Sequence, residues 1–599
     1  MSFMFHPYPY ADPNAVNRIC IPSSVRENLS YGIEAVAKSI SALFENGVKT
    51  IGIDAYPGVE YETLINVLRQ KLAAKNIKFV DAACVLLPPA VITEKLKPCL
   101  PEDRERDPVL LYGRRYTEGY SGLQDSEKVS ALREKIQGAD GLIVFGKGAL
   151  SSKLRDAYNV RIWMDVTPRT SVLNCKYGKN RNIGLAEELP YPLMMRRNYY
   201  VDFETAAELR WEMIKERTID FYITADNPVK MSMLPFDALL DLFRELCRRP
   251  FRCRPVYLEG VWGGYYLHRL RNLPKEMRNC AWIFDMIPLE VSLVARLDKT
   301  EFEVPFFTFV QAMGEDLLGH KAFTEFGGYF PIRFNYDDTY HASGNMSIQC
   351  HPHAEYVIKN HGELGRQDES YYVAVAGQGA KTYLGFNEKD SCEKFFEEAE
   401  RAEKTHEFID YAKYIHAVES KPGTQVMIPA GTVHASGRNQ VILEIGSLTV
   451  GSYTYKLYDY QRIDPQTGVP RPIHLKMGKD VIRGERDKKW TEENLVNHGG
   501  VVREGKGFKE IVAGEHDLLY FSLRTLVFEK EISDETNGLF HVLALVDGEK
   551  VRVESAEHPE LYYDMNFLDI TVVPASFGKY RIVNRGVGTV TVHKTLLKS

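Results

Sequence analysis

The sequence predicts a multidomain protein, with an α/β domain in its first part, a helical segment after it and β-barrel domains in its second part. Its 599 residues are too many for one hydrophobic core and correspond to roughly three or four domains. Strand-like and helix-like segments alternate over about residues 25 to 230. Further along, short strand-like runs recur between turn residues. These three observations together indicate the fold class.

The alternation in the first part is typical of a mainly parallel sheet covered by helices. Apolar runs that indicate strands are "KTIGIDAY", "IKFVDAA", "ADGLIVFG" and "VRIWMDV", and "YETLINVLRQKLAAK" has the apolar spacing of a helix. Two further helical patterns, "DFETAAELRWEMIKERT" and "PFDALLDLFRELCRRPF", enclose "TADNPVKMSML", which we interpret as a loop. We therefore expect a helical connector at about residues 200 to 250.

Composition excludes several classes of partner. The formal net charge is −6 and the isoelectric point is near 6.3, so we expect no general attraction to nucleic acid or to an anionic membrane surface. No apolar run approaches the roughly 18 residues of a membrane helix, and the start of the chain lacks the pattern of a signal peptide. Nine cysteines without a CxxC pair argue against disulfides and against a thiolate zinc site. We expect a cytoplasmic protein, and the sequence leaves its oligomeric state open.

The second part contains a candidate metal site in "NMSIQCHPHAEY", "GRQDESYYV" and "PAGTVHASG". Residues two apart on a strand share a face, so Gln349 and His351 can point into a barrel together while Cys350 points away. Glu369 and His434 lie in other β-rich stretches bounded by turn residues. Two oxygen donors and two imidazoles suit Zn²⁺, and a coordination position left open would mark a catalytic site.

Several motifs occur in an order that resembles the type I mannose-6-phosphate isomerases, especially their bacterial form. They are "FPIRFNYDD", "MSIQCHPHAEY", "GRQDESYYVAVAGQGAKTYLGF", "IPAGTVHASGRNQVILEIG" and "YTYKLYDYQR". The resemblance begins near "YLEGVWGGYYL" and covers the chain from about residue 250 to its end. It implies a cupin fold and one catalytic zinc held by Gln349, His351, Glu369 and His434. It also implies interconversion of mannose 6-phosphate and fructose 6-phosphate, with a phosphorylated hexose as the partner.

With this resemblance we divide the chain at the expected boundaries. Its C-terminal part has strands at regular spacing, as in a second barrel or sandwich. There "VVPASFGKYRI" echoes "MIPAGTVHASG", but Gly578 and Lys579 stand near the place of the histidine, so we expect no metal in it. The expected units are an N-terminal segment (1–24), the α/β domain (25–199), the helical connector (200–250), a catalytic cupin domain (251–475) and a C-terminal cupin-like domain (476–599).

Three residues are candidates for catalysis beside the zinc. Arg333 matches a family lysine of the substrate pocket; it can bind phosphate there, or it can be a strand arginine that faces solvent. Lys456 matches a catalytic arginine of the family, a departure that keeps the charge but loses the bidentate contact. Glu444 can lie on the barrel interior, either as an acid/base for the enediol reaction or as a partner that orients a histidine ligand.

The first part resembles uridine-kinase-like nucleoside kinases around "AYPGVEYET" and "ADGLIVFGKGALSSKLRDAYNVRIWMDVTPRT", but its phosphate loop is degenerate. Gly58 and Thr63 remain, while Tyr61 stands in place of the lysine that reaches the terminal phosphates. The other departures are Ala55, Glu60, Glu62 and Phe145. We therefore expect a structural or regulatory domain without kinase chemistry.

Three functions remain open on the sequence. The leading one is a zinc-dependent mannose-6-phosphate isomerase. The second is a non-catalytic sensor that binds a sugar phosphate, since Arg333 and Lys456 depart from the pattern. The third is a bifunctional protein whose first domain retains kinase activity.

Overall fold

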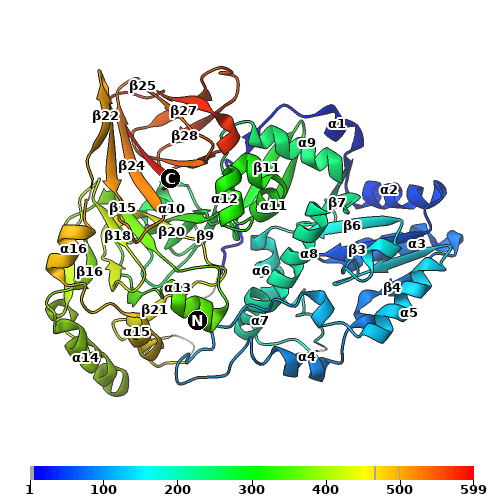
Figure 1. The fold of residues 1–599 in the computed structure, drawn as a ribbon, viewed down its shortest axis with the longest axis horizontal. Helices are drawn as coiled ribbons and strands as arrows, with labels where there is room; N and C mark the ends of the chain where they lie inside the picture. The colour runs from blue at the N-terminus through cyan, green and yellow to red at the C-terminus, as the bar shows by residue number, and fades with distance from the viewer. Residues whose placement is uncertain (1–5, 186, 465–466, 498, 599) are drawn as a thin grey trace.

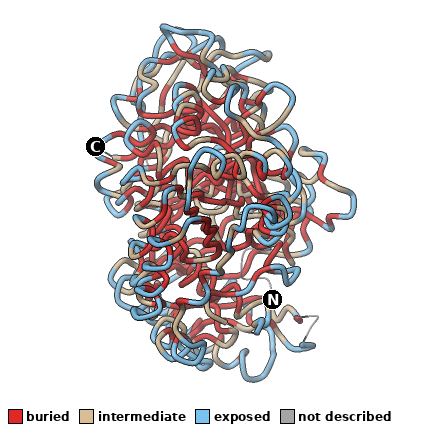
Figure 2. The backbone as a smooth tube through the Cα atoms, turned by 90° about the vertical axis from the view of Figure 1, so that its right-hand side faces the viewer, coloured by how far each residue is buried: buried red, intermediate tan, exposed pale blue. Residues whose placement is uncertain are grey.

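The computed structural model describes residues 6–185, 187–464, 467–497 and 499–598, so residues 1–5 of the expected N-terminal segment lie outside it. Figure 1 shows an elongated molecule, with an α/β half at one end and a β-rich half at the other. Buried backbone runs through the interior, and exposed segments surround it (Figure 2). Within the described residues there is no helix with the length and apolar character needed to cross a membrane.

The α/β half is built on one seven-stranded sheet. Five strands are mutually parallel, and two more follow at one edge, each antiparallel to the strand before it. All six residues of the strand in the middle of the five parallel ones are buried, as expected of a strand covered on both faces. The four strands predicted from apolar runs are confirmed. In sheet order the strands are β2 (Ser30–Tyr31), β8 (Ser232–Pro235), β7 (Phe221–Thr224), β6 (Val160–Asp165), β3 (Thr50–Ala55), β5 (Leu142–Phe145) and β4 (Lys78–Asp81).

Helices cover this sheet, and side chains at the first turn stabilise the start of two of them. Asp125 accepts hydrogen bonds from the N–H groups of Glu127 and Lys128 and so caps α5. Thr167 caps α6 in the same way, ahead of Pro168 at its first position. The helices are α2 (Ile33–Glu45), α3 (Tyr61–Lys71), α4 (Pro89–Leu96), α5 (Ser126–Gln137), α6 (Pro168–Lys176), α7 (Tyr191–Arg197), α8 (Phe203–Lys215) and α9 (Phe236–Cys247).

The expectation of a helical connector at residues 200–250 needs correction. Helices α8 and α9 are present as predicted, but β7 and β8 lie between them and belong to the sheet of the α/β half. Strand β8 begins within the stretch that we interpreted as a loop. Strands β4 and β5 are equally short, but β7 and β8 lie directly beside the two helical patterns, so their place in the sheet becomes visible only in the folded structure.

The β-rich half begins with two antiparallel sheets whose inner faces converge on the candidate site. The first has the order β18 (Gln425–Ile428), β15 (Glu369–Ala376), β20 (Gln440–Ser447), β13 (Ile332–Asp338), β10 (Trp282–Met286), β9 (Val256–Leu258). The second has the order β17 (Ile415–Glu419), β16 (Lys381–Phe386), β19 (His434–Ser436), β14 (Ile348–Cys350), β21 (Tyr455–Tyr458).

Additional elements join this domain to its neighbours. The N-terminal segment pairs with it through β1, which lies parallel to β11. Helix α11 packs on α8 and α9 of the α/β half. The remaining elements up to residue 494 are β1 (Asn17–Arg18), α1 (Ser23–Asn28), α10 (Tyr266–Leu270), β11 (Ser292–Leu297), β12 (Thr300–Pro305), α11 (Phe306–Leu318), α12 (His320–Glu325), α13 (Ala354–His361), α14 (Ser391–Thr405), α15 (Leu475–Val481) and α16 (Lys488–Asn494).

The last hundred residues form two more antiparallel sheets with an apolar cluster of their own. One has the order β22 (Val501–Gly505), β23 (Phe508–Gly514), β24 (Phe521–Phe528), β31 (Val590–Leu597), β26 (His541–Asp547), β29 (Ile570–Val573). The other has the order β25 (Glu531–Glu535), β30 (Lys579–Asn584), β27 (Lys550–Ser555), β28 (Tyr562–Asn566). This agrees with the strand series predicted for the C-terminal part.

Candidate metal centre

Three of the four proposed ligands lie on strands, and the fourth, His351, directly follows one. Gln349 lies on β14, directly opposite His434 at the start of β19, and His351 follows the end of β14. Glu369 is the first residue of β15 in the facing sheet. Cys350, between two of the proposed ligands, is buried in an apolar cluster. The site therefore forms only when the two sheets meet.

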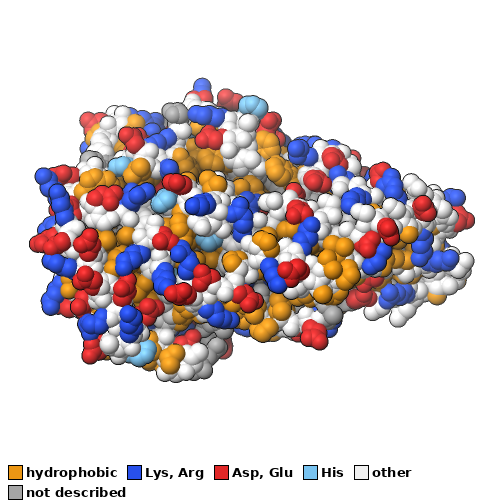
Figure 3. All heavy atoms as spheres, turned by 60° about the horizontal axis from the view of Figure 1, so that its bottom comes forward, with side chains coloured by type: hydrophobic (Ala, Val, Ile, Leu, Met, Phe, Trp, Pro, Cys, Tyr) orange, Lys and Arg blue, Asp and Glu red, His pale blue; other side chains and the backbone are white. Residues whose placement is uncertain are grey.

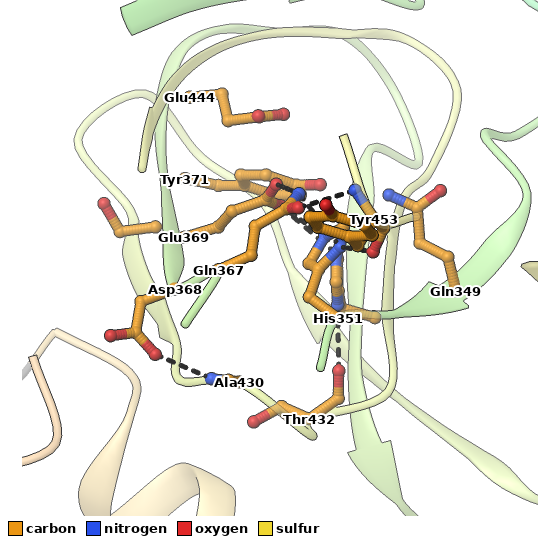
Figure 4. A network of polar contacts seen from close by, with 12 residues as sticks. Gln349, His351, Gln367, Asp368, Glu369, Tyr371, Ala430, Thr432, Glu444 and Tyr453 are labelled. Carbon is orange, nitrogen blue, oxygen red and sulfur yellow. Dashed lines mark hydrogen bonds and ion pairs between the residues drawn. The ribbon is translucent and has the colours of Figure 1, made fainter. Parts of the chain in front are cut away.

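His351, Glu369 and His434 converge on one point. Their ligand atoms all lie within 4.8 Å of one another, and all three side chains are buried. Oε2 of Glu369 lies 3.0 Å from Nε2 of His351 and 3.3 Å from Nε2 of His434. Figure 4 shows His351 and Glu369 together, with Gln349 beside them.

The hydrogen bonds of the two imidazoles fit a metal. Nδ1 of His351 lies 3.0 Å from the carbonyl oxygen of Tyr453, and Nδ1 of His434 lies 2.9 Å from that of Thr432. Each Nδ1 must carry the proton to donate to a carbonyl, so each neutral ring presents a lone pair at Nε2. Both Nε2 atoms and Oε2 of Glu369 are buried, and no hydrogen-bond partner satisfies them among the described residues. Three converging lone pairs without a donor suit a divalent cation such as Zn²⁺.

The charges of this group also favour a bound cation. Burial by itself would raise the pKa of Glu369, but the charges of His351 and Arg333 lower it well below its usual value. Burial likewise would lower the pKa of His351, and the charge of Glu369 outweighs it and raises the pKa. A proton and a cation therefore compete for Nε2 of this ring. Glu369 is therefore a carboxylate whose negative charge attracts a cation to this point.

Arg333 points into the barrel and joins two carboxylates. Its Nη2 donates to Oε1 of Glu369, and its Nη1 donates to Oε1 of Glu444 at 2.7 Å and to Oδ1 of Asn335 at 3.2 Å. Burial alone would lower the pKa of Arg333, but the charges of Glu444 and Glu369 raise it, so the guanidinium stays charged. The alternative that Arg333 faces solvent is therefore wrong.

Lys456 and Gln349 lie next to this group. They face each other across β14 and β21, and both line the same cavity. Oε1 of Gln349 accepts a hydrogen bond of 3.3 Å from the Ser347 hydroxyl. Burial lowers the pKa of Lys456 well below its usual value, although Asp459 opposes the shift. An anion entering the cavity would restore the charge of this buried amine.

The cavity that these residues line has a volume of about 220 Å³. Arg333, Lys456 and Arg471 are the cationic side chains on its described lining, and Glu369 and Glu444 are two of its carboxylates. Aromatic side chains line another part of it: Tyr112, Tyr199, Tyr200, Trp262, Trp282 and Phe284. Its polar side can bind a small charged ligand, and its aromatic side can contact the apolar faces of that ligand.

Four polar residues of the site were not found from the sequence. Gln367 lies 3.1 Å from Nδ1 of His351 and donates to Oε1 of Glu369 at 3.3 Å. Asn335 donates to Asp337 at 2.7 Å, and burial and the charge of Glu444 raise the pKa of Asp337 well above its usual value. The signal was available, because Arg333, Asn335 and Asp337 alternate on one face of β13 and Gln367 and Glu369 do so at the start of β15. The fourth, Tyr453, acts through its backbone carbonyl and leaves no signal in the sequence.

The face of the molecule in Figure 3 carries Lys and Arg side chains interspersed with Asp and Glu. That face shows no broad field of one sign, and the formal net charge of the chain is −6. The positive groups of the cavity are therefore a local feature.

The chain is homologous to mannose-6-phosphate isomerases over about half of its length. It is 29% identical over 335 residues to mannose-6-phosphate isomerase ManA of Bacillus subtilis (strain 168), with 56% of this chain and 95% of that protein covered. It is 28% identical over 241 residues to mannose-6-phosphate isomerase of Streptococcus mutans serotype c, with 38% of this chain and 67% of that protein covered. The homology lies in the C-terminal part.

Solved structures of such proteins also match. The isomerase of Bacillus subtilis matches with a TM-score of 0.45 at 18% identity, covering 58% of this chain and 99% of that one. A mannose 6-phosphate isomerase bound with zinc and yttrium matches with a TM-score of 0.44 at 12% identity, covering 59% and 100%. Residues 32–248 match the family model of a domain of unknown function (DUF8485). The resemblance of this half to nucleoside kinases therefore stays a prediction.

Proposed function

We propose that this protein is a zinc-dependent aldose–ketose isomerase that interconverts mannose 6-phosphate and fructose 6-phosphate. The observation that carries the proposal is the convergence of three buried, unsatisfied ligand atoms of His351, Glu369 and His434 beside a cavity that Glu369 lines. Homology of about half of the chain to proteins named for this activity supports the same reaction.

His351, Glu369 and His434 would hold the zinc, with Gln349 as the fourth ligand implied by the resemblance. When bound, zinc would polarise the C1 and C2 oxygens of the open-chain sugar. The reaction moves the C2 proton of the aldose to C1 and the O2 proton to O1, so that the aldehyde becomes a hydroxymethyl group and C2 becomes the ketone. It needs a base, a group that stabilises the enediolate oxygen and an anchor for the phosphate.

Glu444 is our candidate for moving the proton, because Arg333 holds its carboxylate at the cavity. Lys456 is our candidate for stabilising the enediolate. Both groups of Arg333 that face the site already bind carboxylates, so we assign Arg333 to positioning instead of phosphate binding. Arg471, a buried arginine on the cavity wall that pairs with Asp459 at 3.0 Å, is then our candidate for the phosphate end.

The test is a coupled assay for fructose 6-phosphate formed from mannose 6-phosphate, with metal content measured on the same samples. We expect a chelator to abolish turnover and added zinc to restore it. His434→Ala should lose bound zinc and fall below about one-hundredth of the wild-type rate, because a ligand matters more than the partners that orient it. His416→Ala is the matched control: this buried histidine on β17 of the same barrel pairs with Glu492 and belongs to a different part of the sheet.

A second candidate is a sugar-phosphate sensor without catalysis. Lys456 favours it, because a lysine replaces the arginine of the resembling motif and burial lowers its pKa. A zinc-loaded protein that binds mannose 6-phosphate in calorimetry but forms no fructose 6-phosphate would establish the sensor and refute the isomerase.

A further inference from the structure

One wall of the cavity over the metal centre comes from the α/β half. Leu111, Tyr112, Tyr199 and Tyr200 line it, and all four lie within the stretch that matches a domain of unknown function. We propose that the α/β half is part of this active site: it closes the substrate pocket and holds the loop that orients the ligand His351. This inference deepens the proposed function and rests on it.

An arm, residues 101–116, leaves the α/β half and lies along the barrel. In Figure 1 the blue chain that follows α4 runs from that half toward α15, and Arg106 of the arm pairs with Asp480 of α15. The Tyr112 hydroxyl donates to the carbonyl oxygen of Thr454 at 2.8 Å. The carbonyl of Gly113 lies 2.7 Å from Nδ1 of His361, at the end of α13. The arm is therefore bonded to the barrel at several points beside the metal centre.

The arm is connected to the metal ligand His351 through the loop that it contacts. Thr454 ends the loop Leu448–Thr454. The residue before it, Tyr453, supplies the carbonyl that accepts the Nδ1 proton of His351. The rings of Tyr112 and Tyr453 lie 5.8 Å apart, and the Tyr453 N–H donates to Gln367 at 2.8 Å. A hydrogen bond of this kind sets the tautomer and the direction of a metal-binding imidazole. Tyr112 is thus a positioning residue for His351.

Tyr199 and Glu290 line the pocket itself. The Tyr199 hydroxyl donates to Oε1 of Glu290 at 3.1 Å. Tyr199 is held edge-on to Phe203 of the α/β half, with ring centroids 5.6 Å apart. Burial raises the pKa of Glu290 to about 8, so its carboxyl is largely protonated at neutral pH and can donate to a sugar hydroxyl. The pair is positioned to select a polyol substrate.

Zinc affinity tests the orienting role without any turnover. We expect the zinc dissociation constant of Tyr112→Phe, measured by competition with a chelator in the full chain, to rise about tenfold. Tyr158→Phe is the control: Tyr158 is a buried tyrosine of the α/β half, and its hydroxyl has no hydrogen-bond partner among the described residues. Melting curves establish that both variants fold. An unchanged zinc affinity in Tyr112→Phe overturns the orienting role.

Steady-state kinetics test the substrate wall. Tyr199→Phe and Glu290→Leu should raise KM for mannose 6-phosphate about three- to tenfold and leave zinc content unchanged, because each removes a hydrogen-bonding group on the pocket side. If the wild type binds zinc without turnover, the proposed function is wrong, and the dissociation constant of mannose 6-phosphate replaces KM in the comparison. Variants whose KM and dissociation constant for mannose 6-phosphate match those of the wild type would refute the substrate-binding role of this wall. A wild type that binds no mannose 6-phosphate would refute that role as well.

Discussion

Arg333 connects the metal centre to the candidate acid/base. Its guanidinium binds Glu369, a proposed ligand, and Glu444, the proposed proton carrier, from opposite ends of one planar fork. This geometry leaves Oε2 of Glu369 to face the two histidines. A lysine, which the resembling motif has at this position, could not hold both carboxylates in the same way. The arginine is thus a departure that the site can use.

We predict that Arg333→Met weakens zinc binding about 10- to 100-fold and lowers turnover, because it leaves two buried carboxylates without their partner. Arg333→Lys should fall between this variant and the wild type, since it keeps the charge but loses the fork. Chelator competition and the coupled assay measure the two effects. Arg438→Met, at an exposed position between β19 and β20, is the control. Wild-type zinc affinity in Arg333→Met would contradict the positioning role.

At the scale of elements, the loop between β3 and α3 occupies the position that a phosphate-binding loop would have. Its backbone packs against α6: the Ser171 hydroxyl donates to the carbonyl of Pro57 at 2.7 Å, and Asn174 donates to that of Gly58 at 2.9 Å. Lys179 pairs with Glu60 at 2.9 Å. Hydrogen bonds within the protein therefore occupy groups of this loop, which supports a structural role.

Gly58 offers a direct test of this packing. Its φ is +101°, and a Cβ there would lie 2.6 Å from Cα of Ser171. We expect Gly58→Ala to lower the free energy of unfolding by about 2–4 kcal/mol, from backbone strain plus the clash. Gly47→Ala, with φ of +88° and open space around its Cβ, should cost only the strain, about 1–2 kcal/mol. Denaturant unfolding measures both.

Equal losses in the two variants would show that the loop is not packed as described.

Thermal stabilisation of the wild type by Mg-ATP is a second readout on the same loop. We expect none, because carboxylates stand where phosphate would bind. A clear stabilisation would revive the bifunctional alternative.

At the scale of the molecule, the two halves share one core. A single apolar cluster includes Phe243 of the α/β half and Phe309 of α11, whose rings lie 5.3 Å apart. Buried Arg210 donates to Asp165 at 2.9 Å and to Gln311 of α11 at 2.8 Å. Continuous packing of this kind can hold the α/β half in a fixed place against the metal cavity.

The C-terminal domain is joined to the barrel by a buried histidine that makes the junction sensitive to acid. Nε2 of His593 lies 3.0 Å from Oε1 of Gln425 on β18, and burial lowers the pKa of His593 to about 3. The unfolded chain binds a proton near pH 6.5, while the folded chain does not. Stability from this group is therefore complete above pH 6.5 and is lost as the pH falls toward 3.

We predict that the wild type loses about 2–3 kcal/mol more than His593→Gln between pH 7 and pH 4.5, because glutamine can donate to Gln425 but does not titrate. Melting temperatures across this range measure the difference. His558→Gln, at an exposed histidine of the same domain, should follow the wild type. Parallel pH profiles of wild type and His593→Gln would contradict the prediction.

The sequence by itself determined the elements that depend on local pattern. Apolar runs and their alternation with helices predicted β3 to β6, and a period of two predicted that Gln349 and His351 share a face apart from Cys350. The ligand set came from such patterns together with motif order. Strands β7 and β8 escaped prediction because these short runs lie directly beside two helical patterns.

Only the tertiary structure decided what depends on residues far apart in the chain. Arg333, Glu369 and Glu444 meet because β13, β15 and β20 are neighbours in one sheet, and the choice between solvent and pocket for Arg333 followed from that pairing. The contribution of Tyr112 and Tyr199 follows from packing between the halves, which no local pattern encodes. Side-chain chemistry is written in the sequence, but proximity arises from burial and strand pairing across hundreds of residues.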